Sequence, residues 1–409
     1  MAHFALDMYQ TMGIGVLALL LGRFLTDRIG FLRRFCIPAP VSGGIVFSLL
    51  FLVLRGGCSV ELAFDGTLKD VCMMVFFTTV GFEANFRSIR LGGKPLLVML
   101  VLLAVLVVLQ NLVSIGVACG LSLPPIMGMA AGSIPMVGGH GTAGGFCPLL
   151  ESLGIGSATS LTMAAATFGL VAGSLLGGPL GNRLIQTHKL CLPTGLSARP
   201  PQMSNDEETY FECQENFNVT SSKMLESLSK AGFQIFVAVA LGTVVNKLLS
   251  LTSIVFPTYF GTLLVAAVMR NCAEGIGWCP RLEMRTIPMV GNLSLMLFIS
   301  MAMVSLRLWE LASLAFPLIA MLLAEVLLMA LFAIFIAFPL LGHDYDAAVL
   351  VSGICGFGLG ATPNAMANMS AVCGKYRYTP LPYLIIPVVG SMFVDVINTA
   401  IVTLFLQFL

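Results

Sequence analysis

The chain has 409 residues, of which 57% are hydrophobic and 10% are charged, and its formal net charge is +1. A water-soluble domain carries about 25% charged residues, so this composition excludes a protein whose main solvent is water. The apolar residues fall into runs of about 20, the length that a helix needs to cross a bilayer. The sequence therefore predicts an all-α polytopic membrane protein.

Ten apolar runs follow one another along the chain, and we expect each to be a transmembrane helix. They lie at 8–26, 37–55, 69–86, 95–119, 157–184, 230–250, 254–270, 287–306, 311–340 and 381–408. The first ten residues contain no Lys or Arg, so they lack the basic region of a secretory signal. The first helix is expected to be retained.

Two Gly-rich stretches, at 126–150 and 347–374, are apolar enough for membrane depth but too rich in Gly and Pro for plain helices. We expect them to form re-entrant hairpins. A long polar segment at 186–228, with an acidic run at 206–215, is the natural boundary between two halves. The predicted organisation is a first repeat at 1–185, a cytoplasmic linker at 186–228 and a second repeat at 229–409.

The Lys and Arg residues predict the orientation of the chain in the membrane. With the N-terminus outside, all 21 of them fall on the cytoplasmic side except Arg55, Lys69, Lys247 and Arg307. This asymmetry is what the positive-inside rule requires, so both termini are expected to be periplasmic. Counting either Gly-rich stretch as a full crossing would spoil the balance.

The two halves resemble each other in sequence. Residues 71–100 align with 293–322, and this alignment pairs Phe76 with Phe298 and Pro95 with Pro317. GGHGT at 138–142 likewise corresponds to GLGAT at 358–362. Because each half has an odd number of crossings, five, the second copy enters the membrane from the opposite side. Inverted repeats of this kind are typical of secondary transporters, which bind substrate and coupling ions near the midplane.

The Gly-rich breaks are the predicted binding site. A helix that is interrupted there presents free N–H groups to anions and free carbonyl groups to cations. The predicted substrate-binding residues are Gly138, Gly139, His140, Gly141, Thr142, Gly358, Gly360, Ala361, Thr362 and Asn364. His140 could donate to a carboxylate or sense protons. The alternatives are that the glycines serve packing alone and that the histidine makes a structural hydrogen bond.

Polar groups inside the predicted helices are few, and each is a candidate functional group. Asp395 and Asn398 lie three residues apart on one helix face and could coordinate sodium, with Asn292 and Ser294 as further candidates. Gln110 and Asn111 are weaker candidates of the same type, and each of these side chains could instead join neighbouring helices. Glu325 receives no predicted role.

Other functional classes lack their motifs. TVGF at 79–82 is similar to a potassium-channel filter, but Glu83 replaces the final glycine. The sequence contains no HExxH, no GxSG and no GxxxxGK[ST], so neither intramembrane proteolysis nor ATP-driven pumping is expected. We therefore expect that the protein is not an enzyme and binds no nucleic acid. An ion gradient is expected to drive its activity.

Six segments, spread from one end of the chain to the other, carry a family resemblance. They read FLRRFCIPAPVSGG, GSIPMVGGHGTAGG, TMAAATFGLVAGSLLGGP, VGNLSLMLFISMAMVSLRLWELASLA, YDAAVLVSGICGFGLGATPNAMANM and PVVGSMFVDVIN. In this order they resemble the bacterial sodium/glutamate symporter family. The resemblance implies sodium-coupled import of L-glutamate across the inner membrane, a homodimer, an elevator-type movement and a site framed by the two hairpins. Sodium-coupled transport of another small carboxylate, or a gated anion channel, stays open as an alternative.

Overall fold

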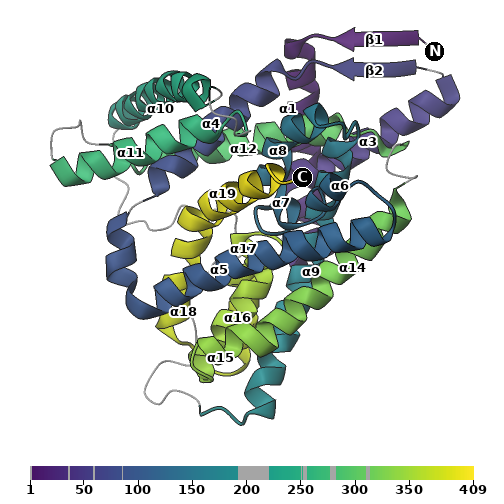
Figure 1. Ribbon diagram of the computed structural model, residues 1–409. Helices are drawn as coiled ribbons and strands as arrows, with labels where there is room; N and C mark the ends of the chain where they lie inside the picture. The colour runs from purple at the N-terminus through teal and green to yellow at the C-terminus, as the bar shows by residue number, and fades with distance from the viewer. Residues whose placement is uncertain are drawn as a thin grey trace.

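The computed structural model describes residues 2–35, 37–58, 60–84, 86–191, 221–249, 251, 256–276, 282–309 and 314–409. Helices form most of this part of the chain (Figure 1), as the apolar runs predict. In a bilayer a helix satisfies its backbone N–H and C=O groups within its own segment. Most of the predicted linker, with its acidic run, lies outside the described residues.

The first half of the described chain runs from the N-terminus to the end of α9. Its elements are β1 (Ala2–Leu6), α1 (Met8–Arg28), α2 (Gly30–Arg34), α3 (Ala39–Cys58), β2 (Val60–Phe64), α4 (Thr67–Glu83), α5 (Phe86–Gly120), α6 (Pro125–Met129), α7 (Ser133–Met136), α8 (Gly139–Ser152) and α9 (Ala158–Thr187).

The second half contains α10 (Ser221–Leu249), α11 (Phe260–Ile276), α12 (Ile287–Val304), α14 (Ala315–Phe332), the π-helical turn η2 (Ala333–Ala337), α15 (Phe338–Leu340), α16 (Tyr345–Gly358), α17 (Thr362–Lys375), α18 (Pro380–Val388), the π-helical turn η3 (Val389–Phe393) and α19 (Val394–Leu406).

The structure confirms the prediction of a helical, multi-pass membrane protein. In the described part of the chain each of the ten predicted crossings overlaps helical elements, and the last of them comprises α18, η3 and α19. Among the described helices, seven are long and apolar enough to span a bilayer, and further apolar helices are shorter. Large apolar side chains such as Phe233 and Phe236 of α10 are exposed, as expected of a surface that faces lipid.

The structure adds one short sheet to the predicted helices. β1 and β2 form a two-stranded parallel sheet, in which Ala2 lies opposite Val60 and Leu6 lies opposite Phe64. The paired strands are separated in the sequence by α1, α2 and α3. Pairing over such a distance leaves no local pattern, so a reading of apolar runs misses it.

The helices pack as two bundles, and each half of the chain contributes to both (Figure 1). We call α1, α3, α4, α10, α11 and α12 the first bundle, and α5–α9 with α14–α19 the second bundle. Within the first bundle, α4 packs against α11 and α12; within the second, α9 packs against α8, α16 and α17. The bundles meet where α12 contacts α8 and where α4 contacts η3.

Glycines bring the helices of the first bundle close together in corresponding places. A Cβ atom on Gly22 or on Gly43 would overlap the backbone where α1 crosses α3. A Cβ atom on Gly242 or Gly261 would do the same where α10 crosses α11. Small residues that allow close backbone approach are characteristic of helix pairs in membranes.

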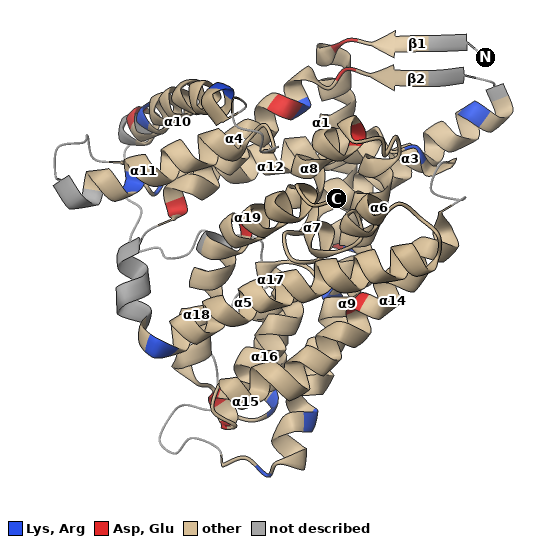
Figure 2. Cartoon of the chain, in the orientation of Figure 1, with Lys and Arg blue, Asp and Glu red and all other residues tan. Residues whose placement is uncertain are grey.

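Charged residues gather toward helix ends and connecting loops, and the interior of both bundles is largely uncharged (Figure 2). This distribution agrees with the high cost of burying a charge in a bilayer. The few polar groups inside the second bundle therefore need individual explanations.

Candidate functional site

The first helix break separates α7 from α8. α8 begins at Gly139, whose φ is +60°, and its N-cap Gly138 provides no side chain to cap the helix. A left-handed φ favours glycine because a Cβ atom would be strained there. Thr142 donates its hydroxyl to the carbonyl oxygen of Ile134 at 2.8 Å and so holds α8 against α7. The break therefore exposes the backbone N–H groups of the first turn of α8.

The second break separates α16 from α17. α17 begins at Thr362, and its N-cap Ala361 likewise makes no side-chain cap. The side chain of Asn364 is fully buried, and its amide nitrogen donates to the carbonyl oxygen of Leu170 at 2.8 Å. Its Oδ1 atom has no hydrogen-bond partner among the described residues. A buried oxygen without a donor is an acceptor available to a ligand.

The two breaks touch each other. A Cβ atom on Gly139 would lie 2.9 Å from the carbonyl oxygen of Gly360, which is two residues before the start of α17. The contact brings two uncapped helix N-termini together from opposite halves of the chain. Each carries the partial positive charge of a helix dipole, so the pair can bind carboxylate groups.

His140 lies directly at the first break, with 5% of its surface exposed. Its Nε2 atom is 3.1 Å from the hydroxyl oxygen of Thr167 on α9. That hydroxyl donates to the carbonyl oxygen of Met163, so it accepts from His140 and the histidine proton is on Nε2. On the next residue, Gly141, a Cβ atom would lie 3.1 Å from the Phe76 ring of α4, so this break faces the first bundle.

Helix α9 supports the second break through a glycine stripe, which consists of Gly169, Gly173 and Gly177 at a spacing of four residues. A Cβ atom on Gly169 would overlap the carbonyl group of Leu359, and one on Gly177 would overlap the Asn368 side chain. The amide nitrogen of Asn368 also donates to the carbonyl oxygen of Gly173 at 2.9 Å. These glycines therefore allow α9 to pack closely against the second break.

Helix α5 holds both breaks through two adjacent amides. Gln110 donates to the carbonyl oxygen of Gly358 at 2.8 Å, at the end of α16. Asn111 accepts from the backbone N–H of Ser133, the first residue of α7, at 3.1 Å. Gly358 itself faces Leu106 of α5 and α14, so it lies in the packing behind the break. Of the two readings that the sequence left open for these amides, sodium coordination and helix connection, the structure shows hydrogen bonds of the second kind.

Comparison of the sequence with known proteins identifies the family of this chain. The sequence profile of the family described as sodium/glutamate symporter matches residues 4–378. The sodium/glutamate symporter of Escherichia coli (strain K12) is 40% identical over 99% of this chain and 98% of its own length. That of Haemophilus influenzae is 36% identical over 96% of this chain and 95% of its own length. The chain belongs to the sodium/glutamate symporter family.

The predicted sodium-binding residues of this family member occupy three environments. Asn398 donates to the Ser133 carbonyl oxygen at 3.1 Å, and its Oδ1 lies 2.8 Å from the Ser133 hydroxyl, so it holds α7. Asp395, one turn earlier on α19, is half-buried and lies near Glu83 at the end of α4. Asn292 and Ser294 are half-buried on α12, in the first bundle. The four predicted residues thus lie on two helices, α19 in the second bundle and α12 in the first.

Three contacts of the breaks were missed by sequence reasoning. Thr167 partners His140, Ser133 joins α5 to α19, and Gly390 in η3 packs directly against the Thr362 side chain. π-helical turns are frequent at functional sites, and η3 places this glycine at the start of α17. Ser133 lies within the Gly-rich motif, which was the only available signal.

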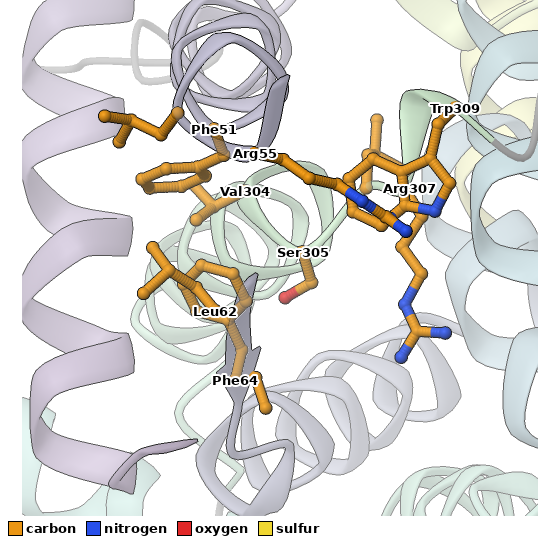
Figure 3. A pocket seen from close by; sticks show the side chains of 11 residues that line it. Phe51, Arg55, Leu62, Phe64, Val304, Ser305, Arg307 and Trp309 are labelled. Carbon is orange, nitrogen blue, oxygen red and sulfur yellow. The ribbon is translucent and has the colours of Figure 1, made fainter. Parts of the chain in front are cut away.

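A pocket of about 150 Å³ lies elsewhere, between α3, β2 and the end of α12 (Figure 3). The guanidinium carbon of Arg55 is 3.8 Å from the centroid of the Trp309 ring, and Arg307 and Ser305 also line the pocket. Its lining includes none of the predicted site residues. The helix breaks, and not this pocket, therefore remain the candidate substrate site of the symporter-family chain.

Proposed function

We propose that the chain imports L-glutamate across the bacterial inner membrane in symport with sodium. The observation that carries the proposal is the contact between Gly139 and Gly360, which places two uncapped helix N-termini side by side. Glutamate has two carboxylate groups, and each helix N-terminus suits one of them. Membership of the sodium/glutamate symporter family supports the same substrate and ion.

In this proposal the substrate lies against the two breaks. The groups that contact it belong to Gly138, Gly139, His140, Gly141, Thr142, Gly360, Ala361, Thr362 and Asn364. Gly358 supports the break, because Gln110 already occupies its carbonyl oxygen. Imidazole and hydroxyl groups beside the helix ends would add specific hydrogen bonds to the charge of the dipoles.

Sodium is the second substrate, and oxygen atoms are its expected ligands. The Asn364 Oδ1 atom, which is buried and has no partner in the described part of the chain, is one available ligand. The Asp395 carboxylate is another, because a charge at this depth is neutralised by a bound cation. We assign Asn292 and Ser294 to the path of sodium along α12. Asn398 is assigned to holding α7 in place.

The proposed architecture is a pair of inverted five-helix repeats, each with a re-entrant hairpin. Corresponding elements of the two halves have corresponding partners: α1 with α3 and α10 with α11, then α4 with α12 between them. Elements α7–α8 and α16–α17 are the two hairpins. Both termini are proposed to be periplasmic, since the distribution of Lys and Arg favours that orientation.

The proposed movement is a displacement of the second bundle past the first. The breaks belong to the second bundle, and near them it meets the first bundle at α12 and α4. Transporters built from inverted repeats alternate access by moving one part against the other. A homodimer, with the first bundle as the fixed part, completes the proposal on the strength of the family resemblance.

Uptake of labelled L-glutamate into proteoliposomes tests the proposal. We expect rapid uptake with an inward sodium gradient and little uptake with an equal potassium gradient or in protein-free liposomes. Competition with unlabelled dicarboxylates separates glutamate transport from transport of another small carboxylate. Equal uptake with and without the sodium gradient would contradict symport and favour the gated channel.

A further inference from the structure

Glu325 is a carboxyl group in the middle of the second bundle that the transport mechanism above does not use. It lies on α14, and none of its surface is exposed. Ser114 of α5 donates its hydroxyl to the Oε1 atom of Glu325 at 2.7 Å. The Oε2 atom has no hydrogen-bond partner among the described residues. One oxygen of the carboxyl group is therefore satisfied and the other is not.

Gln110, a neighbour of Glu325, also has a buried oxygen atom without a hydrogen-bond partner among the described residues. It precedes Ser114 by one helical turn on α5, and its side chain is within hydrogen-bonding reach of the Glu325 carboxyl. Its nitrogen donates to the carbonyl oxygen of Gly358, whereas its Oε1 is buried and accepts from no group in the described chain. Each of these two neighbouring side chains thus has one buried acceptor without a donor, and a single proton shared between the side chains would satisfy both.

We propose that Glu325 is a neutral carboxylic acid whose Oε2–H donates to Gln110, and that it thereby positions the second helix break. The hydrogen bonds then form one chain from Ser114 through Glu325 and Gln110 to the carbonyl oxygen of Gly358. The chain fixes the amide so that its nitrogen holds the end of α16. Gly358 is two residues before Gly360, which touches the first break.

Among the residues whose side chains the structure describes, no cation pairs with the Glu325 carboxyl group. α14 packs against α5, α9, η2 and α16, and the charged residues of those elements are Arg87, Arg90, Lys94, Arg183 and Asp346. In the described structure the carboxyl group interacts with Ser114 and Gln110. An ionised carboxylate here would be a buried charge without a counter-charge, and such groups are neutralised by protonation.

Infrared spectroscopy of the purified protein tests the protonation directly. We expect a protonated-carboxyl band in the wild type that disappears in Glu325→Gln and persists from about pH 6 to about pH 9. Asp395→Asn serves as the control and should leave this band in place. In Gln110→Met the band should move to higher frequency, because the carboxylic acid loses its acceptor. A wild-type spectrum that Glu325→Gln leaves unchanged would overturn the proposal.

Transport measurements test the positioning role, which rests on the proposed function. Glu325→Gln can still donate to Gln110 and accept from Ser114, so uptake and its sodium dependence should stay within about twofold of wild type. Glu325→Met can do neither, and we expect the maximal uptake rate to fall about tenfold at equal protein levels. A large rise in the sodium requirement of Glu325→Gln would instead identify a cation site and refute the proposal. Failure of wild-type uptake would refute the function but leave the infrared result valid.

Discussion

Gly139 combines two constraints in one residue. Its φ is +60°, and its missing side chain leaves room for the carbonyl oxygen of Gly360. Gly154 has a similar constraint, with a φ of +101°, but a Cβ atom there would meet no neighbour within 4 Å. Comparing substitutions at the two positions therefore distinguishes the effect of backbone strain from the effect of disturbing the contact between the breaks.

Gly139→Val is expected to abolish sodium-driven glutamate uptake while the protein still inserts, because the branched side chain would intrude between the breaks. Gly154→Val is the control, and it should keep most of the activity despite a comparable backbone strain. Uptake is measured at matched amounts of protein in the membrane. Similar activity in both variants would remove the contact between the breaks from the mechanism.

Substitution of Asp395 tests whether its carboxylate binds sodium. Asp395→Asn keeps the shape of the side chain and one oxygen but removes the charge. If the carboxylate binds sodium, the sodium concentration for half-maximal uptake should rise about tenfold or more, which corresponds to about 1.4 kcal/mol. The glutamate KM at saturating sodium should change much less. Asp65→Asn, in an exposed loop, is the control. An unchanged sodium requirement would mean that Asp395 has a structural role.

At the scale of elements, the stripe on α9 allows a matched comparison. A Cβ atom on Gly177 would overlap Asn368 of α17, whereas one on the adjacent Gly178 would meet nothing within 4 Å. Gly177→Val should destabilise the second bundle by about 1–3 kcal/mol, as overpacking does, and lower its thermal unfolding temperature in detergent. Gly178→Val should unfold close to wild type. Equal effects would show that helix propensity, and not packing, determines the result.

Elements were predictable from the sequence where their signal is local. Long apolar runs marked the helices, and clustered glycines marked both breaks, because hydropathy and backbone freedom depend on neighbouring residues. The β1–β2 pairing and the turn η3 were not predictable in this way. Nor was the link from Asn111 through Ser133 to Asn398, whose partners are brought together only by tertiary packing. The predicted sodium site at Asp395 and Asn398 stays a prediction, and the structure adds that the Asn398 amide also bonds Ser133.

At the scale of the whole molecule, the two bundles explain why the polar groups lie where they do. The breaks and the hydrogen bonds of Gln110, Asn111 and Asn398 all belong to the second bundle, so they can move together as one body. The first bundle faces the breaks with apolar side chains such as Phe76 and Leu295. Two hydrogen bonds join the bundles beside this apolar surface, between Tyr259 and Thr399 at 3.3 Å and from the Arg307 backbone N–H to Ser160 at 3.1 Å, and the proposed movement would have to break them.

The orientation of the whole chain can be tested with two native cysteines. Cys119, at the end of α5, and Cys191, after α9, are both exposed. The proposed topology places Cys119 outside and Cys191 in the cytoplasm, since only α9 crosses the membrane between them and the first hairpin returns to the side from which it came. Each is studied as the single cysteine of an otherwise cysteine-free protein.

A membrane-impermeant maleimide should label Cys119 in intact cells and Cys191 only after permeabilisation, and permeabilised cells serve as the control that both thiols react. The reverse pattern would invert the orientation, because the positive-inside argument fixes the sign of the whole topology. Labelling of both cysteines from the same side would mean an even number of crossings between them. In that case α7 and α8 would span the membrane together with α9, and the re-entrant hairpin that holds Gly139 at the midplane would be refuted.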